Sequence, residues 1–358
     1  MSFSFGCRVN EAEKQLLDKQ LIDEGFSWDE NDPAFYVINS CAVTGKAERE
    51  VRQHIYQTRK KYPKTTIIVT GCSATLWLKN NTKPEGADYW IDNTKKSAIS
   101  EFIVSLSKQS LPHSSSLITH DKFLNSGRLM IKIQDGCDRF CSYCIVPFTR
   151  GRAVSHKIAD IVKEIQQIKI PIQEVILTAI NTEYFGKETG ETLTELVDSI
   201  LAHTKIERVS FGSIHSWSIT PEFLLWYKNN KDNPRFVHFF HIPIQSGSNT
   251  ILRYMNRNYT CEEILNRLQT IHSINPKALI ATDVIVGFPG ETEKEFEETY
   301  DFLKLSPITK FHVFRYSPRP GTLAEKNPTS LKLCGAQEKR ERSRILRDLE
   351  KQKLKITT

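Results

Sequence analysis

The chain has 358 residues, enough for about two domains, and its 39% hydrophobic and 25% charged residues are typical of a soluble globular protein. No run of about 18 apolar residues exists, which excludes a transmembrane helix, and the N-terminus does not resemble a signal peptide. The net charge of +7 weakly favours a polyanionic partner. We therefore expect a protein of the reducing cytoplasm, where eight cysteines are more often metal ligands or free thiols than disulfides.

The first hundred residues alternate between strand and helix patterns. Such alternation indicates a parallel sheet with helices on its faces, so we predict an α/β domain over residues 1–106. The expected strands are residues 1–5, 35–39, 65–70 and 87–91, and the expected helices are residues 9–24, 45–61, 74–80 and 95–106.

Three cysteines follow the first three predicted strands. They are Cys7, Cys41 and Cys72, each next to a small or turn-forming residue. In open α/β sheets ligands bind beyond the carboxyl ends of the strands, so these side chains should gather at one edge. This placement predicts a metal cluster. The alternative is three separate core cysteines, because free cysteine is often buried.

Residues 107–127 contain Ser, Pro, His and Asn without periodicity, which is typical of a linker. A second domain is predicted over residues 128–330. Here six strand–helix units follow one another, fewer than the eight of a complete barrel. The expected strands are residues 129–134, 174–179, 208–213, 237–242, 279–286 and 310–316, and the helices are residues 157–169, 193–202, 221–229, 261–273 and 293–304.

The loop after the first of these strands has three more cysteines, Cys137, Cys141 and Cys144, at CxxxCxxC spacing. Three thiolates can hold three irons of a 4Fe–4S cluster. The fourth iron then has an open position, as a catalytic metal site requires. The alternative is a zinc knuckle, but zinc sites usually show two CxxC pairs or mixtures of Cys and His.

Other strand ends have polar side chains with two interpretations. His215 follows the third strand and is either a surface residue or a ligand contact. His241 follows the fourth strand and is either a core residue or a general base. After the fifth strand, a Gly-Phe-Pro-Gly turn permits close approach to a ligand, and Thr292 with Glu295 predicts a helix capping box.

Basic residues near the end of the chain suggest a nucleic acid partner. Arg315 and Arg319 lie beside aromatics and could contact RNA, although the nearby prolines could equally form a rigid loop. Residues 337–358 form a predicted basic helix with eight Lys or Arg against four acids, and residues 45–64 contain seven against two. Such helices are often simply solvated, but they also suit RNA backbone contact.

The segments around all six cysteines, residues 6–13, 38–44, 70–72 and 136–144, resemble the radical S-adenosylmethionine (SAM) methylthiotransferases. This resemblance implies a partial (βα)6 barrel after the N-terminal domain, and SAM with two 4Fe–4S clusters as cofactors. It assigns Cys137, Cys141 and Cys144 to the SAM-cleaving cluster. It assigns Cys7, Cys41 and Cys72 to an auxiliary cluster that supplies or carries sulfur. The residues that it places near SAM are Tyr143, Asn181, Gln245 and Asp283.

The family replaces a C–H bond by C–SCH3 and consumes two SAM molecules. Residues 39–44 and 314–322 are most similar to the branch that acts on N6-threonylcarbamoyladenosine 3′ to the tRNA anticodon. Other branches act on isopentenyladenosine or on an aspartate of a ribosomal protein. The expected partners are the tRNA anticodon stem-loop, an electron donor such as flavodoxin or ferredoxin, and a sulfur donor. A non-catalytic, metal-stabilised RNA-binding protein is the alternative from another class.

The chain departs from the family pattern at several places. Ser40 stands where Thr is usual, Ala179 where Gly is usual, and His215 where Glu is usual. After residue 330 we expect only the basic helix, without the small RNA-binding β-barrel that the family normally has, either because the sequence is truncated or because this member lacks the module. Binding to tRNA should then be weaker and more sensitive to salt.

Overall fold

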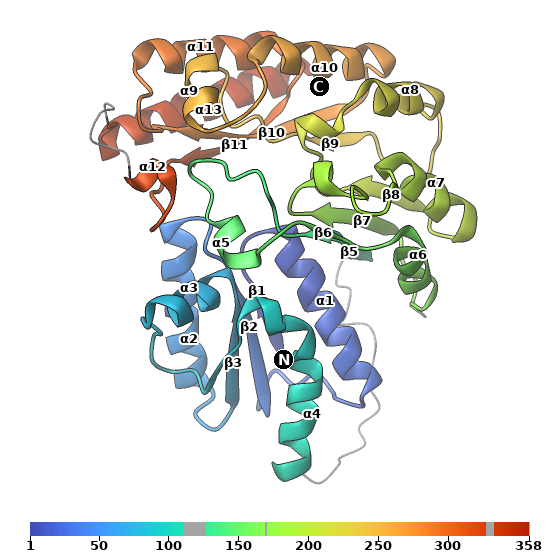
Figure 1. The fold of residues 1–358 in the computed structure, drawn as a ribbon, viewed down its shortest axis with the longest axis vertical. Coiled ribbons are helices and arrows are strands. Elements are labelled where there is room, and N and C mark those ends of the chain that lie inside the picture. Colours follow the sequence, from blue (N-terminus) through green and yellow to red (C-terminus); the bar gives the residue numbers. More distant parts are fainter. Residues whose placement is uncertain (111–126, 169, 327–332, 358) are drawn as a thin grey trace.

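The computed structural model describes residues 1–110, 127–168, 170–326 and 333–357. Two units lie one above the other in Figure 1, with the N-terminal sheet below and a curled half-barrel above. The predicted linker at residues 107–127 lies largely outside the described residues, and its first four residues belong to helix α4 (Ile99–Ser110).

The N-terminal unit is a four-stranded parallel sheet in the order β1-β2-β3-β4. Its central strands are covered on both faces and are therefore almost continuously apolar, with Ile38, Ile67 and Val69 fully buried. The predicted α/β alternation is confirmed. The strands are β1 (Ser2–Ser4), β2 (Phe35–Ser40), β3 (Thr66–Gly71) and β4 (Tyr89–Trp90), and the helices before α4 are α1 (Arg8–Asp23), α2 (Gly45–Lys61), α3 (Cys72–Asn80) and the 3-10 helix η1 (Asn93–Ala98).

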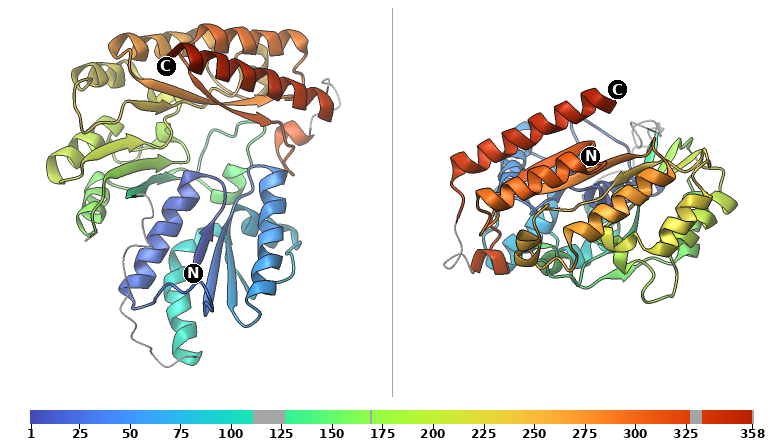
Figure 2. Two further views of the ribbon diagram at one scale, coloured as in Figure 1. Left: turned by 180° about the vertical axis from the view of Figure 1, so that it is seen from behind. Right: turned by 90° about the horizontal axis from the view of Figure 1, so that it is seen from above.

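The second unit contains the six predicted parallel strands, which curl into half of a barrel (Figures 1 and 2). They are β5 (Arg128–Asp135), β7 (Glu174–Ala179), β8 (Arg208–Phe211), β9 (Phe239–His241), β10 (Leu279–Val286) and β11 (Lys310–Arg315). A short strand that was not predicted, β6 (Val154–Ser155), pairs antiparallel with the end of β5.

The half-barrel has a weak point between its third and fourth parallel strands. An isolated bridge pairs Val209 of β8 with Phe236, which precedes β9, and the strands form two sheets, in the orders β6-β5-β7-β8 and β11-β10-β9. The third and fourth strands were predicted as six residues each, but β8 has four residues and β9 has three. The two segments still meet beyond the shorter strands, where the Ile214 N–H donates to the His241 carbonyl at 2.9 Å.

The helices cover the outside of the half-barrel, and their packed faces follow the apolar periodicity of the sequence. At α11, the backbone N–H of Thr292 donates to Glu295 Oε2 at 3.0 Å, as the predicted capping box requires. The helices are α5 (Val146–Arg150), α6 (Ile158–Gln166), α7 (Leu193–His203), α8 (Pro221–Asn229), α9 (Asn249–Tyr254), α10 (Cys261–Ile274), α11 (Glu293–Leu305) and α12 (Leu323–Lys326), with 3-10 helices η3 (Thr182–Tyr184) and η4 (Ser216–Ser218).

The basic C-terminal helix α13 (Ala336–Thr357) is part of the barrel wall. It packs against β11 and α11, and Figure 2 shows it along the outside of the barrel. Leu346 and Leu349 are buried in the main core, and Arg342 is buried with its guanidinium 2.7 Å from Glu291. The interpretation of this helix as simply solvated is therefore wrong for one of its faces, because that face completes the core.

Candidate iron–sulfur and substrate site

The three-cysteine loop leaves the carboxyl end of β5 through a tight turn. Gly136 has a φ of 67°, and a side chain there would collide with the backbone of Arg152, so glycine is required. Gln134 Nε2 donates to the Gly136 carbonyl at 2.9 Å and fixes the turn. Phe140, directly before Cys141, also has a positive φ, 48°, which is uncommon for a bulky residue and turns the chain between Cys137 and Cys141.

Buried polar side chains point at the sulfurs of this loop. Asn181 Nδ2 donates to Cys137 Sγ at 3.7 Å, and the Arg257 guanidinium donates to Cys141 Sγ at 3.6 Å. Burial and the neighbouring Cys141 raise the pKa of Cys144 to about 12. The Cys144 thiol would therefore stay protonated on its own, whereas a bound metal deprotonates a coordinating thiol. N–H donors aimed at sulfur fit the thiolates of an iron–sulfur cluster.

The second cysteine set gathers at the carboxyl edge of the N-terminal sheet. Cys7 lies between β1 and α1, Cys41 follows β2, and Cys72 begins α3 directly after β3. Burial raises the pKa of Cys41 to about 12, and the nearby Cys7 and Cys72 add to the rise. A side chain at Gly6 would overlap Cys41, so that glycine allows the strand ends to meet.

Within the described residues, neither cysteine set has its three sulfurs all within 4.8 Å of one another. Zn–S bonds of about 2.3 Å in a tetrahedron hold sulfurs about 3.8 Å apart, whereas a 4Fe–4S cluster binds its cysteines through separate irons.

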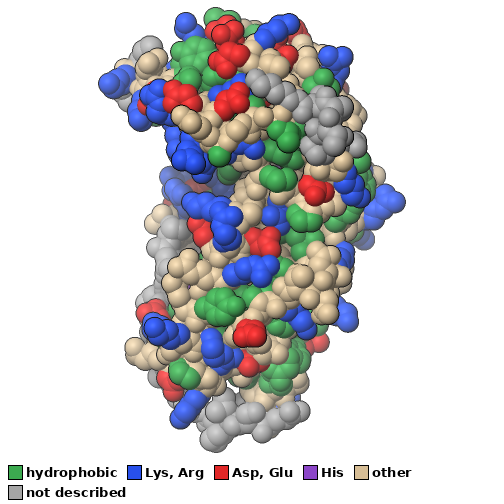
Figure 3. Space-filling view, turned by 90° about the vertical axis from the view of Figure 1, so that its left-hand side faces the viewer, with side chains coloured by type: hydrophobic (Ala, Val, Ile, Leu, Met, Phe, Trp, Pro, Cys, Tyr) green, Lys and Arg blue, Asp and Glu red, His purple; other side chains and the backbone are tan. Residues whose placement is uncertain are grey.

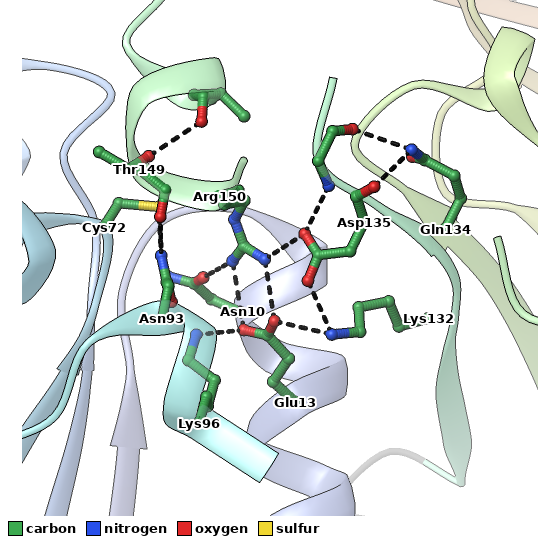
Figure 4. Close-up of polar contacts among 12 residues, drawn as sticks. Asn10, Glu13, Cys72, Asn93, Lys96, Lys132, Gln134, Asp135, Thr149 and Arg150 are labelled. Carbon is green, nitrogen blue, oxygen red and sulfur yellow. Dashed lines mark hydrogen bonds and ion pairs between the residues drawn. The ribbon is translucent and has the colours of Figure 1, made fainter. Parts of the chain in front are cut away.

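The two cysteine sets lie close to each other across the boundary between the two units. Ile145, which directly follows Cys144, packs in one buried cluster with Ala42 and Cys72. Asn93 donates to Cys72 Sγ at 3.5 Å and to the Thr149 carbonyl of α5 at 3.0 Å, as Figure 4 shows. This juxtaposition suits a reaction that uses both centres.

An ion-pair network fastens the loop to the N-terminal unit. The Arg150 guanidinium, at the end of α5, lies 2.9 Å from Glu13 and 2.8 Å from Asp135 (Figure 4). Lys96 and Lys132 lie 2.6 Å and 3.1 Å from the same Glu13 carboxylate. These bases hold the pKa of Glu13 well below its usual range. Sequence reasoning missed the network because its members come from both units.

Two of the predicted SAM neighbours, Tyr143 and Asn181, lie at the three-cysteine loop. Tyr143 packs edge-on against Phe288 at 6.3 Å between ring centres, and Asn181 contacts Cys137 as described. Gln245 has a φ of 72°, which places its side chain on a strained turn held by its N–H bond to the Asp283 carbonyl at 2.9 Å.

Asp283, the fourth predicted neighbour of SAM, contacts two histidines. Its Oδ1 atom lies 3.0 Å from His241 Nε2 and 3.2 Å from His312 Nδ1. Hydrogen bonds from the two imidazoles lower its pKa to about 2, despite burial. Sequence reasoning had singled out His241 and Asp283 separately and had given His312 no role.

His215 is half-buried rather than a surface residue. Burial, and then the nearby Arg257, lower its pKa to about 3, so its imidazole is neutral. The Thr182 backbone N–H approaches His215 Nδ1 at 3.4 Å, and the ring stacks near Trp217. The surface alternative is therefore wrong, and the residue belongs to the wall of the barrel interior.

The two arginines predicted to contact RNA have opposite environments. Arg315 is exposed at the end of β11, whereas Arg319 is only 4% exposed and lies 2.6 Å from Glu48 of α2. Burial leaves Arg319 little access to RNA, because its guanidinium joins the end of the barrel to the N-terminal unit. Figure 3 shows Lys and Arg side chains at separate places along the length of this face, interspersed with acidic and hydrophobic ones.

Comparisons with known proteins agree with this geometry. Residues 131–303 match the radical SAM superfamily, and residues 2–92 match the uncharacterized protein family UPF0004. The chain is 34% identical to threonylcarbamoyladenosine tRNA methylthiotransferase MtaB of Aquifex aeolicus, over 98% of this chain and 87% of that protein. The chain belongs to the radical SAM methylthiotransferase family. Its cofactors are accordingly SAM and two 4Fe–4S clusters.

Further relatives have related names. The MtaB protein of Thermotoga maritima is 32% identical over 98% of this chain and 81% of its own length. The tRNA-2-methylthio-N(6)-dimethylallyladenosine synthase of Fervidobacterium nodosum is 32% identical over 90% and 77%. A radical SAM methyltransferase, TsrM from Kitasatospora setae, shares the fold with a TM-score of 0.61 and 14% identity, over 87% of this chain and 73% of that one.

Because the chain belongs to this family, it is an enzyme, and the alternative of a non-catalytic RNA-binding protein is wrong. In the described parts of the chain, the search for helices that combine bilayer-spanning length with an apolar composition found none.

Proposed function

We propose that this enzyme methylthiolates C2 of N6-threonylcarbamoyladenosine next to the tRNA anticodon. The observation that carries the proposal is the 34% identity, over 98% of the chain, to a relative named for that reaction. The C2–H bond of adenine does not react with acids or bases, so a radical is needed. The base must also leave its stack to reach an interior site, as for other enzymes that modify bases.

We assign the two clusters to the two cysteine sets. Cys137, Cys141 and Cys144 hold the cluster that works with SAM, and Cys7, Cys41 and Cys72 hold the auxiliary cluster. When bound, SAM and these clusters supply the radical chemistry and the sulfur. Support comes from the N–H donors that face the first set and from the meeting of strand ends at the second.

The protein's own residues prepare the site. Asn181 and Arg257 donate hydrogen bonds to cluster sulfurs, which stabilises the charged thiolates. Tyr143 packs with Phe288 and Tyr316 in a buried aromatic group and excludes water beside the loop. We keep Tyr143, Asn181 and Gln245 as proposed neighbours of SAM. The anticodon stem-loop, a flavodoxin or ferredoxin and a sulfur donor remain the partners that we expect.

Counting iron and sulfide tests the cluster assignment. Anaerobically purified protein should contain about eight irons, and replacement of all three cysteines of either set by alanine should leave about four. Cys261→Ala is the matched control, because Cys261 is a buried cysteine outside both sets and should leave the count unchanged. A native count of about four, lost with the loop cysteines, would remove the role of Cys7, Cys41 and Cys72.

The substrate is tested by mass spectrometry of tRNA after reaction with SAM and a reductant. Stem-loops with threonylcarbamoyladenosine should gain the methylthio group. The second candidate is dimethylallyladenosine, because relatives named for it are also 32–33% identical over 90% of the chain. Modification of dimethylallyladenosine alone would select that candidate. Modification of neither RNA would direct the search to the ribosomal-protein aspartate.

A further inference from the structure

Three side chains from neighbouring barrel strands converge on one point inside the barrel. His241 ends β9, Asp283 lies in β10 opposite His312 of β11, and Ala281 of β10 pairs with His241. The residues beside Asp283, Thr282 and Val284, are fully buried on the helix-facing side. Since side chains alternate along a strand, Asp283 faces the barrel interior.

The distances between these side chains are those of a metal-binding set. Asp283 Oδ1 is 3.0 Å from His241 Nε2 and 3.2 Å from His312 Nδ1, and the three atoms all lie within 4.8 Å of one another. Metal–ligand bonds of about 2.1 Å place neighbouring ligand atoms about 3.0 Å apart at right angles and about 3.4 Å apart in a tetrahedron. Within the described residues this is the one group of three such ligands that close together.

The atom types and their support also fit. Two imidazole nitrogens and one carboxylate oxygen suit divalent Fe, Zn or Mn, and they leave positions open for another ligand. The far nitrogen of His241, Nδ1, lies 2.6 Å from Ser213 Oγ. A hydrogen bond on the far nitrogen is the usual support for a metal-binding histidine, because it orients the ring.

One side of the group is open. The side chains of His241, Asp283 and His312 are 8%, 24% and 43% exposed, so access increases toward His312. Arg8 of α1 reaches into the same region, where it donates to the Gly212 carbonyl and interacts electrostatically with Asp283. Arg8 opposes a bare cation here, but Arg8 and a metal together favour a ligand with a negative charge.

We propose that His241, Asp283 and His312 bind one divalent transition metal ion, separate from the clusters, whose open positions take the carboxylate of the threonylcarbamoyl group. The carboxylate part rests on the proposed function, whereas the metal site does not. The site gives Asp283 a role as metal ligand in place of the predicted contact with SAM. It also explains why two histidines approach the same carboxylate oxygen, Asp283 Oδ1, inside the barrel.

Zinc loading of the anaerobic holoenzyme tests the metal site. After loading and desalting, elemental analysis should find about one zinc per chain, and crystals should give an anomalous zinc peak between the three side chains. Asp283→Asn and His312→Ala should each lose this zinc and retain about eight irons. His272→Ala is the matched control, because His272 is an exposed residue of α10, and this variant should keep the zinc. Equal zinc in native protein and both variants, or no peak at the site, would overturn the proposal.

His312→Ala distinguishes loss of the metal site from misfolding, because His312 is the most exposed of the three ligands and its replacement should not unfold the protein. Its iron content and its melting temperature should match those of the native enzyme. If zinc stays bound in this soluble variant and is lost only when Asp283→Asn unfolds the chain, the three residues are no metal site.

A binding experiment tests the carboxylate part without any turnover. Zinc-loaded holoenzyme should bind a threonylcarbamoyladenosine stem-loop roughly tenfold more tightly than its methyl ester, as expected for a charge-assisted contact. Holoenzyme that contains the clusters but no zinc should show a smaller difference. Equal preference in both forms would overturn this part. If the native enzyme modifies only dimethylallyladenosine, the proposed function fails while the zinc result stands on its own.

Discussion

The Arg150 guanidinium lies 2.9 Å from the Glu13 carboxylate, and both side chains are almost completely removed from solvent. Arg150 ends the helix that follows the three-cysteine loop, and Glu13 belongs to the helix that follows Cys7. One buried ion pair therefore connects the two segments that are proposed to hold the two clusters. Their relative position depends on it more than on any exposed contact between the units.

Replacing Glu13 by Gln should destabilise the protein strongly. The change leaves Arg150, Lys96 and Lys132 without their shared carboxylate, and loss of one member of a buried pair costs about 3–5 kcal/mol. Urea unfolding of the anaerobic holoenzyme measures this loss. Glu50→Gln is the control, because Glu50 pairs with Lys46 at the surface and should change stability by less than about 1 kcal/mol. Equal stability of the two variants would contradict the importance of the network.

The arginines at the end of the barrel should separate RNA binding from stability. Arg315→Ala removes an exposed charge, so we expect weaker tRNA binding, a salt dependence reduced by about one counterion, and unchanged unfolding. Arg319→Ala breaks the buried pair with Glu48 and should cost about 1–3 kcal/mol of unfolding free energy. Filter binding at several salt concentrations and urea unfolding test both variants. The reverse pattern would show that Arg319 is the RNA contact after all.

Helix α13 should be indispensable for folding of the barrel. Leu346→Ala removes a fully buried side chain between α13 and the core, which costs about 2–5 kcal/mol. The exposed neighbour Arg347→Ala should change the unfolding free energy by less than about 0.5 kcal/mol. If the melting temperature falls by the same small amount in Leu346→Ala and Arg347→Ala, the helix is dispensable.

Local patterns explain which elements were predictable. Helix α2 was placed correctly because Thr44 caps it, with Ala47 N–H donating to Thr44 Oγ1 at 3.1 Å, and Tyr62 ends it. Strand β7 was placed correctly because both its faces are buried, which produces a continuous apolar run. The spacing of Cys137, Cys141 and Cys144 is equally local, whereas Cys7, Cys41 and Cys72 were singled out by their places after three predicted strands.

The features that sequence reasoning missed depend on contacts between distant residues. Arg257 reaches Cys141 across 116 positions, and nothing near Arg257 signals a metal. His312 joins Asp283 only because β11 pairs with β10 in this register. The burial of Arg319 depends on Glu48, 271 positions away. Such pairings are fixed by strand order and by the docking of the two units, which periodicity does not give.

Stability should decrease below neutral pH in a way that depends on His215. In the folded protein the pKa of His215 is about 3, whereas an unfolded histidine has a pKa of about 6.5. Between these values the unfolded chain binds more protons, so the unfolding free energy falls as pH falls. From pH 7.5 to 5.5 this one group should account for about 1 kcal/mol of the lost unfolding free energy.

Urea unfolding of native protein and of His215→Asn at both pH values measures this contribution. We expect a smaller loss in the variant, while the exposed control His203→Asn should behave like the native protein. An identical loss in His215→Asn would show that His215 is charged in the folded state or free to leave the barrel wall.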